Sequence, residues 1–227
     1  MSTLISWQNA NRCAAALVLL FLVAPILAIV PLSFNGGSFL SYPLDGFSLR
    51  WYAAVLESPR WLLALKNSVL IGVASMVLAT ALGTLAALGL NLAQFRFKGL
   101  LLAVLLSPMI VPTVITAVGV YFLFSSLGLA SSFTGMVLAH TALATPFVVI
   151  AVNATLQGLD HSLLRAAASL GAGPVLTFRR VTLPLILPGV ASGAVFAFAT
   201  SFDEVVVSLL LAGPEQRTLP REMFSGV

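Results

Sequence analysis

Residues 165–184 read RAAASLGAGPVLTFRRVTLP, and this polar stretch between two long apolar blocks decides how the chain is organised. Asp160, just before it, can cap a short helix by accepting from the first free backbone N–H groups. Gly171 suits the left-handed position at the end of that helix, and Pro174 is typical of the first turn of another. The stretch therefore predicts two short helices joined by a glycine hinge, all within one loop.

The first of these helices has a thin surface. Ala166, Ala167 and Ala168 carry small side chains, so another backbone can approach them closely. Composition alone would also fit a basic loop that lies on anionic lipid headgroups. The spacing of the small residues favours a docking surface instead.

That spacing is Ala166-Ala167, three residues, Gly171, nine residues, and then the sequence VTLP that ends at Pro184. It resembles the EAA loop of ABC importer permeases, whose pattern is EAA-x3-G-x9-I-x-LP. The order, both gaps and the closing Leu-Pro agree, while Val181 replaces isoleucine and Arg165 replaces the acidic first residue. The resemblance implies that the loop couples the chain to an ATPase. The coupling residues it implies are Arg165, Ala166, Ala167, Ala168, Leu170, Gly171, Val181, Leu183 and Pro184.

The composition independently indicates a membrane protein. Hydrophobic residues make up 59% of the 227 residues and charged residues 8%, against roughly 25% charged in ordinary soluble domains. Lipid must cover that much apolar surface. The net charge of +4 then reflects basic loops and gives no sign of nucleic-acid binding. Cys13 is the single cysteine, which excludes an internal disulfide and a cysteine metal cluster.

Hydropathy predicts an all-α polytopic membrane fold, and the resemblance implies that residues 1–227 form a single permease domain. The five predicted transmembrane helices cover residues 13–32, 67–90, 100–124, 133–156 and 183–211. Residues 34–65 mix aromatic side chains with sparse charges and predict a periplasmic interfacial segment. The loop at 91–99 carries Arg96 and Lys98 without an acid, which favours the cytoplasm, as for the coupling loop at 157–182.

Small residues and prolines predict how these helices pack. The second span repeats small side chains at helical spacing, and the fifth contains Gly189-x-x-x-Gly193, a pattern for close helix contact. Pro108 and Pro112 interrupt the third span, whose freed carbonyls need partners from neighbouring helices or a water-lined cavity.

Two adjacent acids stand within the predicted fifth span. A charge at mid-bilayer costs about 2.5–3.5 kcal/mol on insertion scales, so Asp203 and Glu204 require an explanation. One interpretation is an ion pair with an interfacial base such as Lys66. The other is an acidic lining, together with Phe202, for the path of a cationic solute. His140 is more simply interpreted as a hydrogen-bonded interhelical residue than as a proton relay or a ligand.

No catalytic or metal-binding constellation is present in the sequence. It contains neither G-x-x-x-x-G-K nor H-E-x-x-H, and Gly171-Ala172-Gly173 lacks the preceding strand and third glycine of a nucleotide loop. We therefore expect a transport subunit that is not an enzyme and binds no cofactor or metal itself. ATP and Mg²⁺ would be bound by a partner chain.

The resemblance extends over most of the chain. The segments FSLRWY, SPMIVP, SFDEVVV and TLP, which begin at residues 47, 107, 201 and 218, are similar to permeases of the spermidine/putrescine importer group. This group implies an inner-membrane half-channel for a small organic cation that works by alternating access. Its partners would be a second, different permease, two ATP-binding subunits and a periplasmic solute-binding protein. A sixth helix would follow the polar segment at 213–226.

Other functions remain open at this point. The same group includes permeases for amino-acid-like solutes and ions. An ion-gradient transporter would need no docking loop and would show broken helices in matching halves, while a membrane scaffold would not require the loop spacing.

Overall fold

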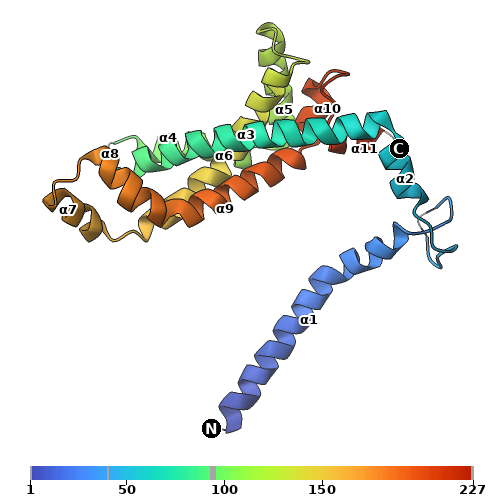
Figure 1. Cartoon of the computed structure of the whole chain (residues 1–227), viewed down its shortest axis with the longest axis horizontal. Coiled ribbons are helices and arrows are strands. Elements are labelled where there is room, and N and C mark those ends of the chain that lie inside the picture. Colours follow the sequence, from blue (N-terminus) through green and yellow to red (C-terminus); the bar gives the residue numbers. More distant parts are fainter. Residues whose placement is uncertain (1, 40, 93–95, 226–227) are drawn as a thin grey trace. The chain divides into compact units, whose positions relative to one another are not determined.

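The computed structural model describes residues 2–39, 41–92 and 96–225 (Figure 1). Residues 93–95 of the predicted inner loop, and Gly226 and Val227 of the C-terminal segment, lie outside the described residues. The regular elements of the described residues are helices, and the predicted all-α fold is confirmed. The chain divides into two compact units, one up to Leu62 and one from Leu63 onwards.

The first unit contains α1 (Ser2–Leu32), α2 (Arg50–Glu57) and the first residues of α3. α1 ends at the predicted position, but it begins well before the predicted start because the polar tail contains no glycine or proline to stop a helix. Its side chains from Trp7 to Val30 are all exposed, and this stretch is long enough to cross a bilayer. Cys13 lies on this exposed helix, as expected of a lipid-facing residue.

The loop between α1 and α2 is held by one buried side chain. Asn35 accepts hydrogen bonds from the N–H groups of Gly37 and Asp45, at 3.1 and 2.8 Å, and donates to the carbonyl of Phe39 at 2.9 Å. Phe34 stacks on Phe47 with 5.0 Å between ring centroids. The segment is therefore an ordered turn built on backbone contacts, and its position at a membrane interface stays a prediction.

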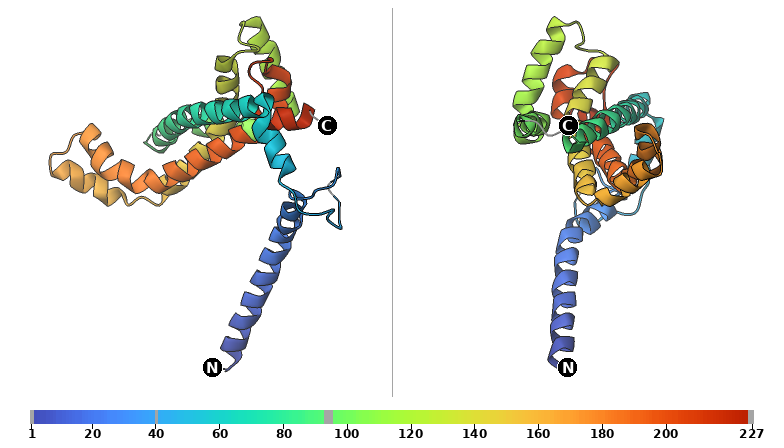
Figure 2. Two further views of the ribbon diagram at one scale, coloured as in Figure 1. Left: turned by 45° about the vertical axis from the view of Figure 1, so that its right-hand side comes forward. Right: turned by 90° about the vertical axis from the view of Figure 1, so that its left-hand side faces the viewer.

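The second unit is built on three long helices. α3 (Pro59–Leu92), α6 (Phe133–Gln157) and α9 (Leu183–Phe202) run side by side in both orientations of Figures 1 and 2. Each is long and apolar enough to cross a membrane. Glycines bring them together: a Cβ on Gly83 of α3 would stand 2.7 Å from Val148 Cβ of α6, and one on Gly193 of α9 would stand 2.9 Å from Val148 Cα. The predicted close-packing faces are confirmed.

The third span is interrupted at Pro112, as predicted, whereas Pro108 lies inside a continuous helix. It consists of α4 (Lys98–Ile110) and α5 (Thr113–Ser126), which are bent by 103°. Val111, between them, is extended at φ −72° and ψ 133°, as the residue before a proline prefers. Pro112 therefore ends the first helix and starts a new one in another direction. α4 packs against α6, and α5 packs against α10 (Val206–Leu211).

The predicted fifth span is also corrected, at both ends. α8 (Pro174–Thr177) continues through a π-helical turn (Phe178–Thr182) directly into α9, so the second short helix of the loop is the start of the spanning helix. At the other end, the helix stops at Phe202, and residues 203–205 lead into α10. Asp203 and Glu204 consequently lie in a helix break and not within a span.

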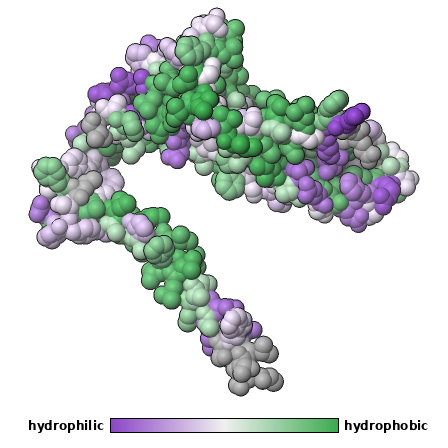
Figure 3. All heavy atoms as spheres, turned by 180° about the vertical axis from the view of Figure 1, so that it is seen from behind, coloured by the Kyte–Doolittle hydropathy of each residue, from purple (hydrophilic) through white to green (hydrophobic). Residues whose placement is uncertain are grey.

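Polar side chains gather at one end of the second unit. Figure 3 shows apolar surface along the long helices and hydrophilic surface at the end that carries α7 (His161–Ser169). At the opposite end, Asn67 at the start of α3 donates to the carbonyls of Glu215 and Arg217, at 2.8 and 2.9 Å. These contacts hold the segment that leads to α11 (Leu219–Ser225) against α3.

Candidate functional site

The coupling loop is shaped by its own sequence. Asp160 caps α7 as predicted, since its carboxylate accepts from the N–H of Ser162 at 2.8 Å and from the Ser162 hydroxyl at 2.7 Å. These two hydrogen bonds lower the pKa of the Asp160 carboxyl below its ordinary value. The cap is therefore ionised and complete throughout the neutral pH range.

The glycine hinge is confirmed at the other end of α7. Gly171 has φ +80°, its N–H donates to the carbonyl of Ala168 at 3.0 Å, and the N–H of Ala172 donates to that of Ala167 at 3.0 Å. This pair of bonds is the Schellman motif, which requires a left-handed residue at its centre. Gly173 then precedes Pro174 at the first turn of α8, also as predicted.

One face of α7 is apolar and uncovered in this chain. Leu163, Ala166, Ala167 and Leu170 stand at positions i, i+3, i+4 and i+7; Leu163, Ala166 and Leu170 are exposed and Ala167 is half-buried. Leu170 is 88% exposed, an extreme value for a leucine in an ordered helical loop. Apolar side chains spaced in this way on a helix facing water are typical of a surface that packs on another protein.

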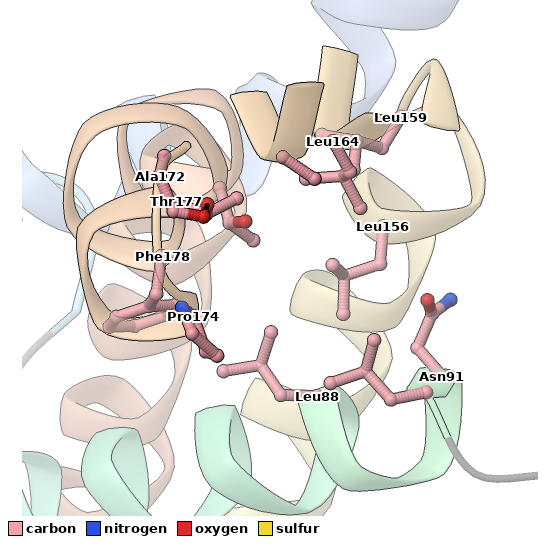
Figure 4. A pocket seen from close by; sticks show the side chains of 12 residues that line it. Leu88, Asn91, Leu156, Leu159, Leu164, Ala172, Pro174, Thr177 and Phe178 are labelled. Carbon is pink, nitrogen blue, oxygen red and sulfur yellow. Dashed lines mark hydrogen bonds between the residues drawn. The ribbon is translucent and has the colours of Figure 1, made fainter. Parts of the chain in front are cut away.

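A neighbouring face of α7 points into the molecule. Leu164 and Ala168 line an apolar pocket of about 460 Å³ between α7, α8 and the nearby ends of α3 and α6. Figure 4 shows Leu164 and Leu159 on one side of this pocket, Pro174 and Phe178 on the other, and Leu88 below. The pocket therefore separates α7 from the ends of the long helices, and side chains of both line it.

Arg165, the departure from the acidic first residue, lies on α7 roughly opposite the middle of the uncovered face, as the helical angle of 100° per residue requires. It is exposed, and its charge helps to keep the nearby Asp160 ionised. The closing residues of the motif lie elsewhere: Val181 and Leu183 are half-buried near the start of α9, and Pro184 is exposed in its first turn.

The second candidate site is the break between α9 and α10, residues 203–205, which we call the acid break. Asp203 is exposed and lines a pocket of about 660 Å³ together with Phe202 and residues of α11. The α11 residues that line this pocket are Leu219, Pro220, Met223 and Phe224. Within the described part of the chain Asp203 forms no ion pair with Lys66, and an ion pair with another interfacial base stays a prediction.

Glu204 differs from its neighbour in role. Its Oε1 accepts from the N–H of Val207 at 3.0 Å, which caps the first turn of α10. Phe202 is half-buried and stacks with Phe198, 5.5 Å between ring centroids. The three residues proposed for the solute path therefore divide into an exposed acid, a capping acid and an aromatic wall.

His140 is completely buried and hydrogen-bonded, as predicted. Its Nδ1 lies 2.8 Å from the hydroxyl of Ser201, and its Nε2 lies 3.4 Å from that of Ser208. The structure does not bring His140, Asp203 and Glu204 into one cluster with the coupling residues, since the full length of α9, about 30 Å by helical rise, separates them.

The contribution of α11 to the acid pocket was missed from sequence. The signal available was a threonine before Leu-Pro at residues 218–220, a pattern typical of a helix start. Nothing local indicates that this helix folds back to α9. Its position depends on long-range bonds, such as the one from the N–H of Leu219 to the Ser68 hydroxyl at 2.7 Å.

The helical body is apolar, with an uncovered apolar face at one end and an exposed acid at the other, and its long helices can cross a membrane. Residues 79–225 match the family described as "Binding-protein-dependent transport system inner membrane component". The spermidine/putrescine transport system permease protein PotC of Escherichia coli is 34% identical over 207 residues, 91% of this chain and 78% of PotC. The putrescine transport system permease protein PotI of E. coli is 35% identical over 214 residues, 91% of this chain and 76% of PotI.

A solved structure shares the fold. The crystal structure of a bacterial ABC transporter involved in the import of the acidic polysaccharide alginate aligns with a TM-score of 0.74 and 16% identity, covering 97% of this chain and 79% of that chain. The chain therefore belongs to the family of inner-membrane components of binding-protein-dependent ABC importers. It is a multi-pass inner-membrane permease subunit, and the alternatives of an ion-gradient transporter and a scaffold are excluded.

Proposed function

We propose that this permease imports a small organic polycation, such as putrescine or spermidine, and that Asp203 lies on the solute path. The exposed carboxylate of Asp203 in a pocket walled by aromatic and apolar side chains is the observation that carries the proposal. The similarity to PotC and PotI, whose names state polyamine transport, supports it.

The pocket suits an alkylammonium group. A carboxylate attracts the ammonium, and the faces of Phe202 and Phe224 can add cation–π attraction of about 0.5–2 kcal/mol each. The methylene carbons between two amino groups can lie against Leu219 and Met223. Because the pocket is open, the solute can be released again.

We infer that ATP and Mg²⁺ are bound by two ATPase subunits, one of which receives the uncovered face of α7 on the cytoplasmic side. A second, different permease would complete the channel, and a periplasmic binding protein would deliver the solute. The exposed Leu163 and Leu170 supply apolar contact area, and the alanines between them allow a close approach.

Movement of α7 has a direct route to the acid break. α8, the π-helical turn and α9 form one continuous helical path from Pro174 to Phe202. A shift of the docked loop when the ATPase dimer closes therefore displaces this path as a unit. Alternating access would follow if this displacement opens the acid pocket to one side of the membrane at a time.

The test is uptake of radiolabelled putrescine by cells that depend on the complete transporter, with unlabelled competitors. We expect spermidine to compete and molybdate and neutral amino acids not to compete. The chain purified from these cells should bring an ATPase subunit and a second permease, with ATP hydrolysis stimulated by the binding protein. Competition by an anion or an amino acid but not by polyamines would overturn the solute assignment and leave the family unaffected.

A further inference from the structure

We propose that His140 is a positioning residue that holds the break between α9 and α10 and so sets where the Asp203 carboxylate stands. This inference rests on the proposed function, because it concerns the same acid. It assigns to His140 neither a proton relay nor contact with the solute. The residue acts through Ser201 and Ser208.

The histidine contacts both sides of the break. From α6, Nδ1 lies 3.1 Å from the carbonyl oxygen of Ser201, two residues before Asp203, and 2.8 Å from the Ser201 hydroxyl. Nε2 lies 3.4 Å from the hydroxyl of Ser208 on α10. A single buried ring therefore connects three helices at the point where the chain changes direction.

The partners of the ring leave its donor pattern to the tautomer. Nδ1 can donate to the Ser201 carbonyl or accept from the Ser201 hydroxyl, and Nε2 carries the proton only in the second case. The Ser201 carbonyl is among the last four of α9, which have no partner within their own helix. In a dry interior such a group needs a donor from elsewhere, and Nδ1 of His140 is in place to supply it.

The second contact extends to the other acid. The hydroxyl of Ser208 donates to the carbonyl of Glu204 at 3.0 Å, while Glu204 Oε1 accepts from Val207. His140 thus adjoins a short chain of bonds that fixes the backbone immediately after Asp203. The distances of 2.8–3.1 Å on the α9 side and 3.4 Å on the α10 side indicate that the α9 side is held more firmly.

Amide side chains can separate the two contacts. The terminal nitrogen of asparagine occupies nearly the position of Nδ1, and that of glutamine nearly the position of Nε2, relative to the backbone. His140→Asn therefore keeps a polar group beside Ser201, whereas His140→Gln keeps one beside Ser208, and His140→Leu keeps neither. Thr141→Val is the matched control, because the Thr141 hydroxyl donates only within α6, to the Val137 carbonyl at 2.7 Å.

The first readout is independent of the solute. In the complete transporter carrying Cys13→Ser and Asp203→Cys, the rate at which a membrane-impermeant maleimide labels the new thiol reports its placement. We expect His140→Leu to change this rate by about fivefold or more, His140→Gln by less and His140→Asn least, in line with the loss of about 1 kcal/mol of hydrogen bonding. Thr141→Val should leave the rate unchanged.

The second readout uses Asp203 itself and putrescine uptake. His140→Leu should raise KM by about tenfold with little change in the maximal rate or in recovery of the ATPase subunit, and His140→Asn should restore most of the loss. Equal labelling rates in all the variants that assemble would overturn the positioning role. If labelling follows the expected order but Asp203→Asn leaves uptake kinetics unchanged, the solute assignment fails and the positioning role stands.

Discussion

The coupling loop and the acid break lie at opposite ends of α9 and are held by different kinds of interaction. At the coupling loop, the decisive bonds join residues two to five positions apart, such as Asp160 with Ser162 and Ala172 with Ala167. At the acid break, they join residues more than sixty positions apart, as between His140 and Ser208. The first site keeps its shape as a self-contained unit, which suits a docking surface. The second depends on three helices, which suits a part that changes when the helices move.

The largest expected effect is a loss of uptake caused by a substitution in the coupling loop that leaves the rest of the fold intact. Gly171→Trp adds bulk at a position where the chain itself leaves open space, and the strain at its φ of +80° is confined to the loop, so insertion should be normal. ATP-driven uptake should fall on the order of 30-fold, as for loss of about 2 kcal/mol at an interface hot spot, while the associated ATPase activity becomes uncoupled. Gly99→Trp, also in open space, is the control and should transport nearly normally. Undiminished uptake with Gly171→Trp would count against the loop as a docking surface.

The next largest effect concerns the close contact between α6 and α9, the helix that connects the coupling loop with the acid break. In Gly193→Ala the added Cβ would lie 2.9 Å from Val148 Cα, which is backbone and cannot move aside. We expect a loss of about 1–3 kcal/mol in stability, seen as a lower midpoint temperature for the purified transporter. Gly119→Ala on α5 meets nothing within 4 Å and should not lower it. Equal midpoints for the two variants would mean that α6 and α9 are not packed this closely in the assembly.

The two neighbouring acids provide a comparison within the break. Asp203→Asn removes the exposed charge and should raise KM for putrescine by about tenfold without affecting recovery of the ATPase. Glu204→Gln keeps an oxygen that can accept from the N–H of Val207, so its effect on KM should be several times smaller. Uptake kinetics measured for both variants would contradict this division of roles if Glu204→Gln proved the more damaging.

The smallest effect refines the claim that the coupling loop is locally determined. Gly171→Ala places a Cβ on a residue at φ +80°, which costs about 1–2 kcal/mol, whereas Gly173→Ala has φ −70° and costs little. Amide exchange of α7 should become faster in the first variant only. The same exchange rates in both would show that the hinge is imposed by its surroundings and not by the glycine.

The same contrast explains how far the sequence could be interpreted. Short sequence patterns predict three features correctly: the Asp160 cap, the Gly171 hinge and the close-packing face at Gly193. The bend of α4 against α5 follows from Pro112, but its angle of 103° depends on which helices receive the two halves. Asp203 was placed within a span because apolar residues continue on both sides of it. The break there lies between two residues that His140 of α6 contacts, Ser201 and Ser208, and these contacts are distant in sequence.

The position of α11 beside the acid pocket could not be predicted from the sequence for the same reason. Asn67 and Ser68 are ordinary residues in a helix pattern, and their partners lie about 150 positions later in the chain. Periodicity identifies the face of a helix but not the loop that will settle on it.

The π-helical turn between α8 and α9 also sets the rotation of the preceding loop about the axis of α9. Leu183 donates to the carbonyl of Phe178, five residues back, so this turn holds one residue more than an α-helical one. Deleting one residue from 178–182 would restore a regular helix and rotate everything before it by about 100° around the axis of α9. The apolar face of α7 would then point about 100° away from its present direction, although every other residue of the loop was still present. The extra residue of the π-helical turn therefore sets the direction of the apolar face of α7 relative to the glycine face of α9.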